Sequence, residues 1–238
     1  MATQQVKKNL VVVNDFLNNK MKNIHTKRLI FCFVLISSTI LLISHSKQQT
    51  KNKAVNFDSL SLFDGTSLRD WEITDFDDRG KVYIKDNSII IEKGETCSGI
   101  RWVKKIPKIN YEISLEAKRV DGNDFFCGMT FPVKNEYCTL IIGGWGGTVV
   151  GLSSIEGLDA AENETGTMKR FSNGQWYYIR LRVTENTIKA WINKEKYIDF
   201  EKTDQKLSLR WEVEPSKPFG IATWKTTAAL RNVKLHNF

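Results

Sequence analysis

The sequence predicts an all-β domain, a sandwich or a barrel, over residues 55–238. Three observations predict it. Several short segments alternate between apolar and polar residues, turn-forming residues recur at roughly the spacing of 8–12 residues that separates strands in such folds, and helical periodicity is absent beyond Val55. The part of the chain that follows the first 46 residues is long enough for one β-domain with a full-sized core.

Four segments have the period of two that places one face of a strand in a core and the other in solvent. These segments are 111–118, 176–183, 188–193 and 207–213. Hairpin turns are expected near Asn186 and at Asn193-Lys194, where residues that tolerate left-handed backbone occur. By contrast, Leu140-Ile141-Ile142 is a continuous apolar run, typical of a strand covered on both faces.

Aromatic residues lie on the polar face of two of these predicted strands. They are Trp176, Tyr178 and Trp191, and their neighbours on that face include Arg180, Arg182 and Lys189. Such a patch is covered by loops or binds a ligand, and sugars suit it because their C–H faces pack on aromatic rings. The alternative is that cross-strand aromatic pairs simply stabilise the sheet.

The first 46 residues are a basic leader with an apolar segment at 29–43 (LIFCFVLISSTILLI), flanked by Lys27-Arg28 and Lys47. The segment has the length of a signal-peptide h-region, and Ser44-His45-Ser46 would allow cleavage after Ser46. Translation from Met21 would give an n-region of ordinary length, and an uncleaved anchor is the alternative. Residues 47–54 are a polar linker. Either way we expect an exported domain that is periplasmic, secreted or anchored, with membrane contact only through the N-terminal segment.

The charge of the predicted domain argues against a nucleic-acid partner. The formal net charge is +8, but residues 1–46 hold six of the 35 Lys and Arg and one of the 27 Asp and Glu. Residues 47–238 therefore contain 29 basic and 26 acidic residues, a balance far from the basic face that nucleic acid requires.

Histidine and cysteine chemistry is also limited. The predicted domain has one histidine, His236, the third residue from the end, which disfavours a Ser-His-Asp triad, a histidine general base and a His-based zinc site. Its three cysteines, Cys97, Cys127 and Cys138, lack the spacing of metal ligands. They are interpreted as small buried residues, with one disulfide as the alternative in an oxidising compartment.

The remaining candidates for chemistry are carboxylates with nearby Asn, Lys, Arg and Trp. Glu162 and Glu164 stand at i and i+2, so on an extended segment they would project the same way and could act as acid and base on a glycosidic bond. A solvated loop is the alternative. The segment 121–124 (DGND) could bind Ca²⁺ or form a plain hairpin turn. The run 143–147 (GGWGG) indicates a tight loop that displays Trp145.

Four segments in order resemble the 3-keto-disaccharide hydrolase family, formerly a domain of unknown function. They are 62–71 (LFDGTSLRDW), 111–118 (YEISLEAK), 173–193, and the pair 220–221 and 231–233. The resemblance covers about residues 60–235. It implies a concanavalin A-like jelly-roll β-sandwich of two curved antiparallel sheets, with the site on the concave face.

The chain departs from the family at its presumed polar site. The family pattern "yE.Q.lD" matches residues 137–143 (YCTLIIG), so its Glu, Gln and Asp are replaced by Cys138, Leu140 and Gly143, while Tyr137 and Glu116 agree with the family. The pattern "lQ.h" of the closing strand is replaced by residues 222–225 (ATWK). This indicates a divergent member whose site is built from other residues.

The leading hypothesis is an exported hydrolase of glycosidic bonds, acting on disaccharides or glycosides that include 3-keto forms. The predicted catalytic residues are Glu116, Glu162 and Glu164. The predicted sugar-binding residues are Arg101, Tyr137, Trp145, Asn163, Trp224 and Lys225, with Trp145 and Trp224 as the platform. No cofactor or metal is expected, Ca²⁺ at 121–124 being the one alternative. A carbohydrate-binding module without catalysis, or an envelope protein, are the competing hypotheses.

Overall fold

The structure, a computed structural model, describes residues 58–238. The predicted leader and linker lie outside this range, so the expectations on signal peptide, anchor and cleavage stay predictions. Among the described residues, no helix has the length and apolarity needed to cross a bilayer.

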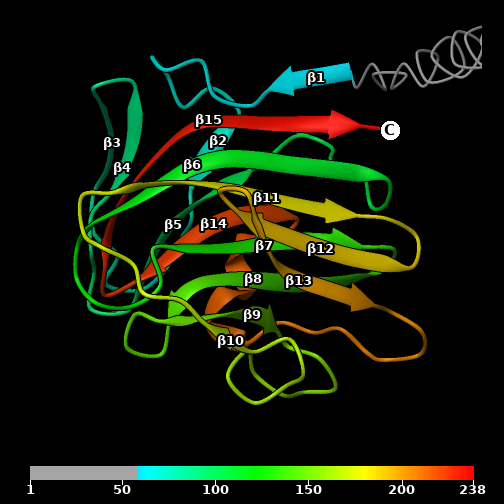
Figure 1. The fold of residues 1–238 in the computed structure, drawn as a ribbon. Helices are drawn as coiled ribbons and strands as arrows, with labels where there is room; N and C mark the ends of the chain where they lie inside the picture. The colour runs from blue at the N-terminus through cyan, green and yellow to red at the C-terminus, as the bar shows by residue number, and fades with distance from the viewer. Residues whose placement is uncertain (1–57) are drawn as a thin grey trace, which may run out of the picture. The chain divides into compact units, whose positions relative to one another are not determined.

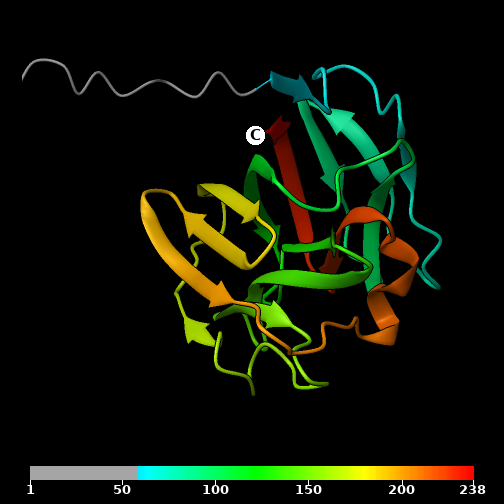
Figure 2. The ribbon, with the colours of Figure 1, turned by 90° about the vertical axis from the view of Figure 1, so that its right-hand side faces the viewer.

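The described residues form two antiparallel sheets that face each other as a sandwich (Figures 1 and 2). Sheet A has the order β13-β12-β11-β6-β15-β4-β3, with β1 also paired to β15, and sheet B has the order β10-β9-β8-β7-β14-β5-β2. The strands of sheet A are β1 (Asp58–Ser61), β3 (Val82–Lys85), β4 (Ser88–Ile91), β6 (Tyr111–Asp121), β11 (Trp176–Val183), β12 (Thr187–Ile192), β13 (Glu195–Glu201) and β15 (Thr227–Asn237). Those of sheet B are β2 (Trp71–Ile73), β5 (Cys97–Trp102), β7 (Cys127–Val133), β8 (Glu136–Gly144), β9 (Val149–Ser153), β10 (Thr167–Met168) and β14 (Phe219–Trp224). The predicted fold class is confirmed.

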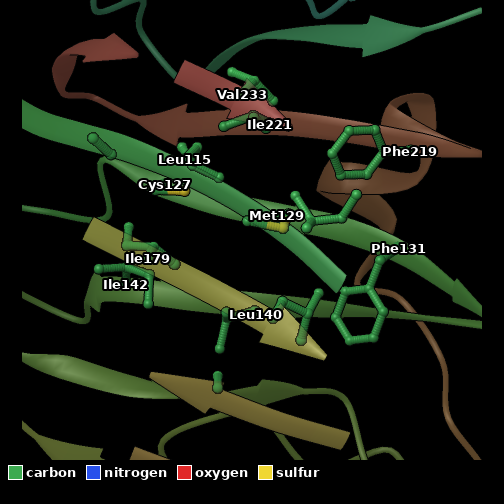
Figure 3. Packing of buried hydrophobic residues seen from close by; sticks show 14 of the residues in the cluster. Leu115, Cys127, Met129, Phe131, Leu140, Ile142, Ile179, Phe219, Ile221 and Val233 are labelled. Carbon is green, nitrogen blue, oxygen red and sulfur yellow. The ribbon is translucent and has the colours of Figure 1, made fainter. Parts of the chain in front are cut away.

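The core lies between the sheets and is built from the apolar row of each strand (Figure 3). On β6 and β11 the rows predicted from alternation are buried, and Leu115 and Ile179 are completely inaccessible to solvent. Sheet B supplies the opposing rows, which include Met129, Leu140 and Ile221. Because each inner row fills the core, the intervening residues of every strand point to the outer face of its sheet.

The last two strands hold central positions. β14 lies between β7 and β5 in sheet B, and β15 lies between β6 and β4 in sheet A. β15 also pairs along the first described strand, with Leu235 opposite Leu60. The connection from β14 to β15 therefore joins the two sheets, and each strand fills a central position in its own sheet.

One predicted strand is wrong. Residues 207–213 do not form a strand: Leu207 makes an isolated bridge to Ile155, and the chain then enters a short 3₁₀ helix, η1 (Trp211–Ser216). Pro215 within this turn has no N–H to give to a ladder, which disfavours a strand there. The turn closes with the Lys217 N–H donating to the Glu214 carbonyl at 3.2 Å.

Two of the three aromatic residues predicted on the outer face of sheet A, Trp176 and Trp191, are covered by cations of the same face, whereas Tyr178 stays exposed. Arg231 and Lys118 lie 4.1 Å and 4.6 Å from the centre of the Trp176 ring. The Arg180 guanidinium lies 4.4 Å from the centre of the Trp191 ring. These cation–π contacts favour the stabilising interpretation of this face over the sugar-binding one.

The cysteines are buried and unpaired within the described residues, as expected for small core residues. Burial raises the pKa of each thiol to about 12. Cys127 and Cys138 belong to the inner rows of β7 and β8, whereas Cys97 lies on the outer face of sheet B.

Candidate functional site

A cleft of about 200 Å³ opens on the outer face of sheet B. Its floor comes from outward-pointing residues of β8 and β9, and loops and η1 form its walls. The lining residues are Cys97, Asp124, Phe125, Thr139, Ile141, Trp145, Ser153, Arg210, Glu212, Val213 and Trp224. The lining thus combines aromatic rings with a small number of charged and hydroxyl groups, which is the usual composition of a small-molecule site.

Trp145 stands on the cleft wall at the tip of the glycine-rich loop that follows β8. Its backbone has a φ of +48°, next to Gly146 at +82°, so the loop folds back tightly, and 42% of the Trp145 surface stays exposed. Asp124 holds the loop, because its carboxylate accepts hydrogen bonds from the Gly146 N–H (3.1 Å) and the Phe125 N–H (2.7 Å). Trp224 lies nearby, and its backbone N–H donates a hydrogen bond to the Phe125 carbonyl at 3.1 Å. One carboxylate and one loop therefore position the aromatic part of the cleft.

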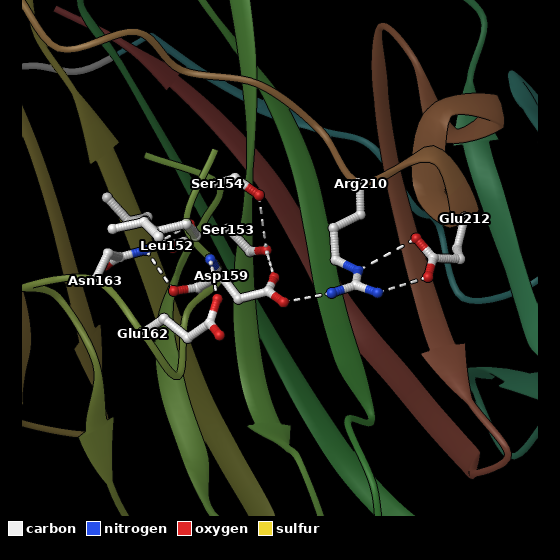
Figure 4. A network of polar contacts seen from close by, with 9 residues as sticks. Leu152, Ser153, Ser154, Asp159, Glu162, Asn163, Arg210 and Glu212 are labelled. Carbon is white, nitrogen blue, oxygen red and sulfur yellow. Dashed lines mark hydrogen bonds and ion pairs between the residues drawn. The ribbon is translucent and has the colours of Figure 1, made fainter. Parts of the chain in front are cut away.

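Arg210 links two carboxylates at the other side of the cleft (Figure 4). Its Nε and Nη2 donate to the Glu212 carboxylate at 3.2 Å and 2.8 Å, and its Nη1 donates to Asp159. Asp159 also accepts a hydrogen bond from the Ser153 hydroxyl at 3.3 Å. The guanidinium thereby ties η1 to the loop after β9.

Glu212 stays ionised at neutral pH. Burial alone would raise the pKa of this carboxyl, but the hydrogen bonds from Arg210 and from its own backbone, together with the Arg210 charge, outweigh burial and lower it. A general acid for glycoside hydrolysis needs the opposite, a carboxyl whose raised pKa keeps it protonated. Glu212 is therefore suited to accept hydrogen bonds and not to donate a proton.

The structure does not bring the three predicted catalytic acids together. Glu116 lies on β6 and points to the outer face of sheet A, since its neighbours Leu115 and Ala117 are in the core, so it is on the opposite side of the sandwich from the cleft. Its carboxylate accepts hydrogen bonds from Arg231 (2.6 Å and 2.8 Å) and from Asn232 (2.8 Å). Burial opposes these bonds, yet they lower the pKa of Glu116. Glu116 therefore does not share a cleft with Glu162 or Glu164. It forms an ion pair with Arg231 on the outer face of sheet A instead.

The segment that carries Glu162 and Glu164 is a turn and not the extended segment that was expected. Asn163 shapes it by donating from its amide to three backbone carbonyls, those of Leu152 (2.7 Å), Asp159 (2.8 Å) and Leu158 (3.1 Å). Both glutamates are exposed; Glu162 accepts a 3.4 Å hydrogen bond from the Asp159 N–H, and Glu164 borders a different hollow with Tyr197. Neither lines the cleft, and the geometry gives Asn163 a role in shaping the loop.

The predicted sugar-binding residues divide between the cleft and other places. Trp145 and Trp224 line the cleft. Arg101 lies on β5 and pairs with Glu72 at 2.6 Å, and Tyr137 lies on β8 with Lys217 5.0 Å from the centre of its ring. Lys225 is exposed in the turn between β14 and β15. The last three do not line the cleft, so the predicted grouping is met only by the two tryptophans.

The segment 121–124 connects the two sheets instead of closing a hairpin. Asp121 forms a 2.7 Å ion pair with Lys93, while Asp124 turns toward the cleft. In the described part of the chain no cluster of three or more His, Cys, Asp or Glu side chains could hold a metal ion. The Ca²⁺ alternative stays a prediction.

Two residues that the sequence matches to polar positions of the family, Cys138 and Leu140, point inward. Cys138 and Leu140 belong to the core row of β8, so residues at these positions cannot point into a site. The outward row is Tyr137, Thr139 and Ile141, of which Thr139 and Ile141 lie in the cleft. Arg210 and Glu212 were missed because they lie in the segment expected to be a strand.

Comparisons with known proteins agree with this architecture. The model of a family described as the 3-keto-α-glucoside-1,2-lyase-like domain matches residues 58–236. No curated protein matches the chain. Three of the similar solved structures are a protein with a galectin-like fold from Bacillus subtilis (9% identity, TM-score 0.54, 75% of this chain and 94% of that one), the VIP36 exoplasmic/lumenal domain in a Ca²⁺/Man3GlcNAc-bound form (11%, 0.51, 75% and 88%), and a candidate glycosyl hydrolase from Parabacteroides distasonis (15%, 0.50, 76% and 94%).

At these identities the solved structures support the fold alone, which is the jelly-roll sandwich expected from the sequence. The family match supports a carbohydrate-related role and spans nearly all of the described residues. The chain therefore belongs to the 3-keto-disaccharide hydrolase family, the family of 3-keto-α-glucoside-1,2-lyase-like domains.

Proposed function

We propose that this protein binds carbohydrate in the cleft on sheet B. The observation that carries the proposal is the pair of tryptophans, Trp145 and Trp224, that line one cleft together with hydrogen-bonding carboxylates. Sugar C–H faces pack on aromatic rings, and sugar hydroxyls donate hydrogen bonds to groups such as Asp124 and Glu212. The volume of about 200 Å³ is below the roughly 300–1,000 Å³ of sites for drug-sized ligands, so we expect one sugar ring to enter and the rest of a glycan to remain outside.

Binding without cleavage agrees best with the positions and the ionisation of the carboxyl groups. The carboxyls that were expected to form an acid–base pair lie on two faces of the molecule, and in the cleft Arg210 keeps Glu212 ionised. Hydrolysis by the usual mechanism needs two carboxyls on either side of one bond, one of them protonated. Glu212 is not such a protonated partner, because Arg210 lowers the pKa of its carboxyl.

A second candidate is cleavage of a glycosidic bond, including bonds in 3-keto glycosides. Family membership favours it, and Asp124 and Glu212 both line the cleft. On this hypothesis Asp124 would act as the base at the sugar, and Glu212 would orient it.

Either activity is proposed to take place outside the cytoplasm. The basis is the sequence of residues 1–46, with its basic flank and the apolar segment at 29–43.

The test uses the purified full-length chain with a panel of disaccharides and their 3-keto forms. Binding is measured by isothermal titration calorimetry, and released monosaccharide is measured by chromatography. We expect saturable binding that Trp224→Ala and Trp145→Ala weaken about tenfold or more. Tyr178→Ala is the matched control for Trp145→Ala, because Tyr178 is 41% exposed but lies on the outer face of sheet A. It should bind like the wild type.

Two outcomes change the conclusion. Release of monosaccharide that Asp124→Asn and Glu212→Gln abolish would establish the second candidate in place of the first. Equal losses of affinity in Tyr178→Ala and Trp145→Ala would show that the cleft is not the binding site.

A further inference from the structure

We infer that the cleft selects a glycan that carries positive charge, such as one built from amino sugars with free amines, over neutral and acidic glycans. This inference rests on the proposed carbohydrate binding and adds the class of ligand. It comes from the charge balance of the cleft, from its uncovered aromatic rings and from the contrast with the rest of the domain.

The charge balance of the cleft is negative. Arg210 is the one cationic side chain in the described lining, and it is shared between two carboxylates, Glu212 and Asp159. That group of three has one net negative charge. Asp124 adds a second negative charge, and within residues 58–238 its carboxylate contacts the backbone N–H groups of Phe125 and Gly146 and forms no ion pair with a cationic side chain. A ligand in this cleft therefore meets two uncompensated negative charges.

The carboxylate of Asp124 can still accept a hydrogen bond from a ligand. Each carboxylate oxygen has two acceptor positions, and its oxygens accept one backbone N–H each, from Phe125 and Gly146. A protonated amine would form a charge-assisted hydrogen bond there, which is stronger than the bond that a sugar hydroxyl can form.

The aromatic rings of the cleft are free to receive a cation. On sheet A the rings of Trp176 and Trp191 are already covered by arginine and lysine side chains at 4.1–4.6 Å. Within residues 58–238 no such cation lies over Trp145 or Trp224, although both line the negative cleft. Carboxylates next to open aromatic faces are the arrangement that recognises ammonium groups.

The rest of the domain does not share this charge. Residues 58–238 hold 26 basic and 26 acidic residues, so the domain as a whole has no formal net charge. Long-range attraction would therefore not draw a cationic glycan to the protein in general. Preference for a cationic ligand would have to come from the cleft itself.

The experiment compares four tetrasaccharides of matched length with the full-length chain by isothermal titration calorimetry. They are β-1,4-linked oligomers of glucosamine, N-acetylglucosamine and glucose, and an oligogalacturonate. At about pH 5.5 amines are protonated while carboxylates with ordinary pKa values are ionised. We expect the glucosamine oligomer to bind about tenfold more tightly than the neutral oligomers, and the oligogalacturonate to bind least. Raising NaCl from roughly 50 to 300 mM should reduce the preference several-fold, a measurement that needs no variant.

Asp124→Asn is the decisive variant, because it removes the charge while one oxygen still accepts one of the two backbone N–H groups, those of Phe125 and Gly146. We expect it to bind the neutral and the cationic oligomer about equally. Asp204→Asn, which changes an exposed acid outside the cleft lining, is the control and should keep the preference.

Equal binding of the neutral and cationic oligomers by the wild type, or a preference that survives both Asp124→Asn and high salt, would overturn the inference while leaving carbohydrate binding intact. Absence of binding to all four oligomers and to the disaccharide panel would instead refute the proposed function.

Discussion

Replacing Arg210 with methionine should destabilise the protein by about 2 kcal/mol at pH 7. Methionine keeps much of the length of the side chain but leaves Glu212 and Asp159, with side chains 14% and 17% exposed, without their shared cation. Removing one partner of a fully buried pair costs about 3–5 kcal/mol, and exposed pairs contribute about 0–1 kcal/mol. The Arg210 side chain is 43% exposed, which places the expected cost between these limits.

The cost should shrink in acid, and the sign follows from Glu212. In the wild type the pKa of Glu212 lies below its ordinary value of 4.5, so the ion pair stabilises the fold above about pH 4.5 and is lost as the pH falls through the lowered pKa. In the variant burial is no longer offset by Arg210, so the pKa of Glu212 should rise. On acidification, protonation of Glu212 removes a buried unpaired charge from the variant, whereas in the wild type it breaks the ion pair with Arg210. The difference in stability between the two proteins should therefore shrink.

Urea unfolding at about pH 7 and about pH 4 measures this difference. With a typical dependence on urea for a domain of this size, about 2 kcal/mol corresponds to a midpoint lowered by about 1 M at neutral pH. Arg101→Met is the matched control, because Arg101 is 42% exposed but pairs with Glu72, which is 54% exposed, so its loss should cost less than about 1 kcal/mol. Equal costs in the two variants, or a cost that does not diminish in acid, would refute the reasoning.

Three further changes test other parts of the structure. Glu116→Gln should lower stability by about 1 kcal/mol, since its bonds to Arg231 weaken, and leave glycan affinity unchanged; calorimetry that shows lost affinity would move the site to sheet A. Gly146→Ala and Gly147→Ala both place a side chain at positive φ, about 1 kcal/mol of strain, but only at Gly147 would the new Cβ lie 2.7 Å from a backbone carbonyl. Urea midpoints should therefore fall further for Gly147→Ala, and equal shifts would mean that the carbonyl moves aside. The three cysteines of the described domain, whose pKa values burial raises to about 12, should resist iodoacetamide at pH 8 until the protein unfolds, as peptide mapping by mass spectrometry can establish.

The inward and outward faces of the long strands could be predicted from the sequence. When only one face of a strand is buried, apolar residues at every second position identify that face. Segments 111–118 and 176–183 are correct to the residue for this reason. Where both sides are covered the pattern is ambiguous, and the register of β8 was inferred from motif letters instead. Alternation also occurs by chance outside strands, as at 207–213, where Leu207 and Val213 are buried but the chain enters η1.

The site could be predicted only in its local part. The glycine run around Trp145 predicts a tight loop that exposes this aromatic residue, and in the structure Trp145 lines the cleft. Asp124 and Arg210 meet there only because β8 and β9 carry the intervening floor, a long-range arrangement that no spacing in the sequence encodes. Paired acids close in sequence, Glu162 and Glu164, were misleading because Asn163 curls their segment into a turn.

The central positions of β14 and β15 set the order of events during synthesis. Neither sheet can close before β14 and β15 have been made, since each fills the gap between two earlier strands, and the first described strand waits for the last. A chain synthesised only as far as β13 therefore holds sheets that each lack a central strand and have open edges. The domain can complete its fold only once β15 has been made, so a stop codon within residues 219–237 would leave a gap in at least one sheet.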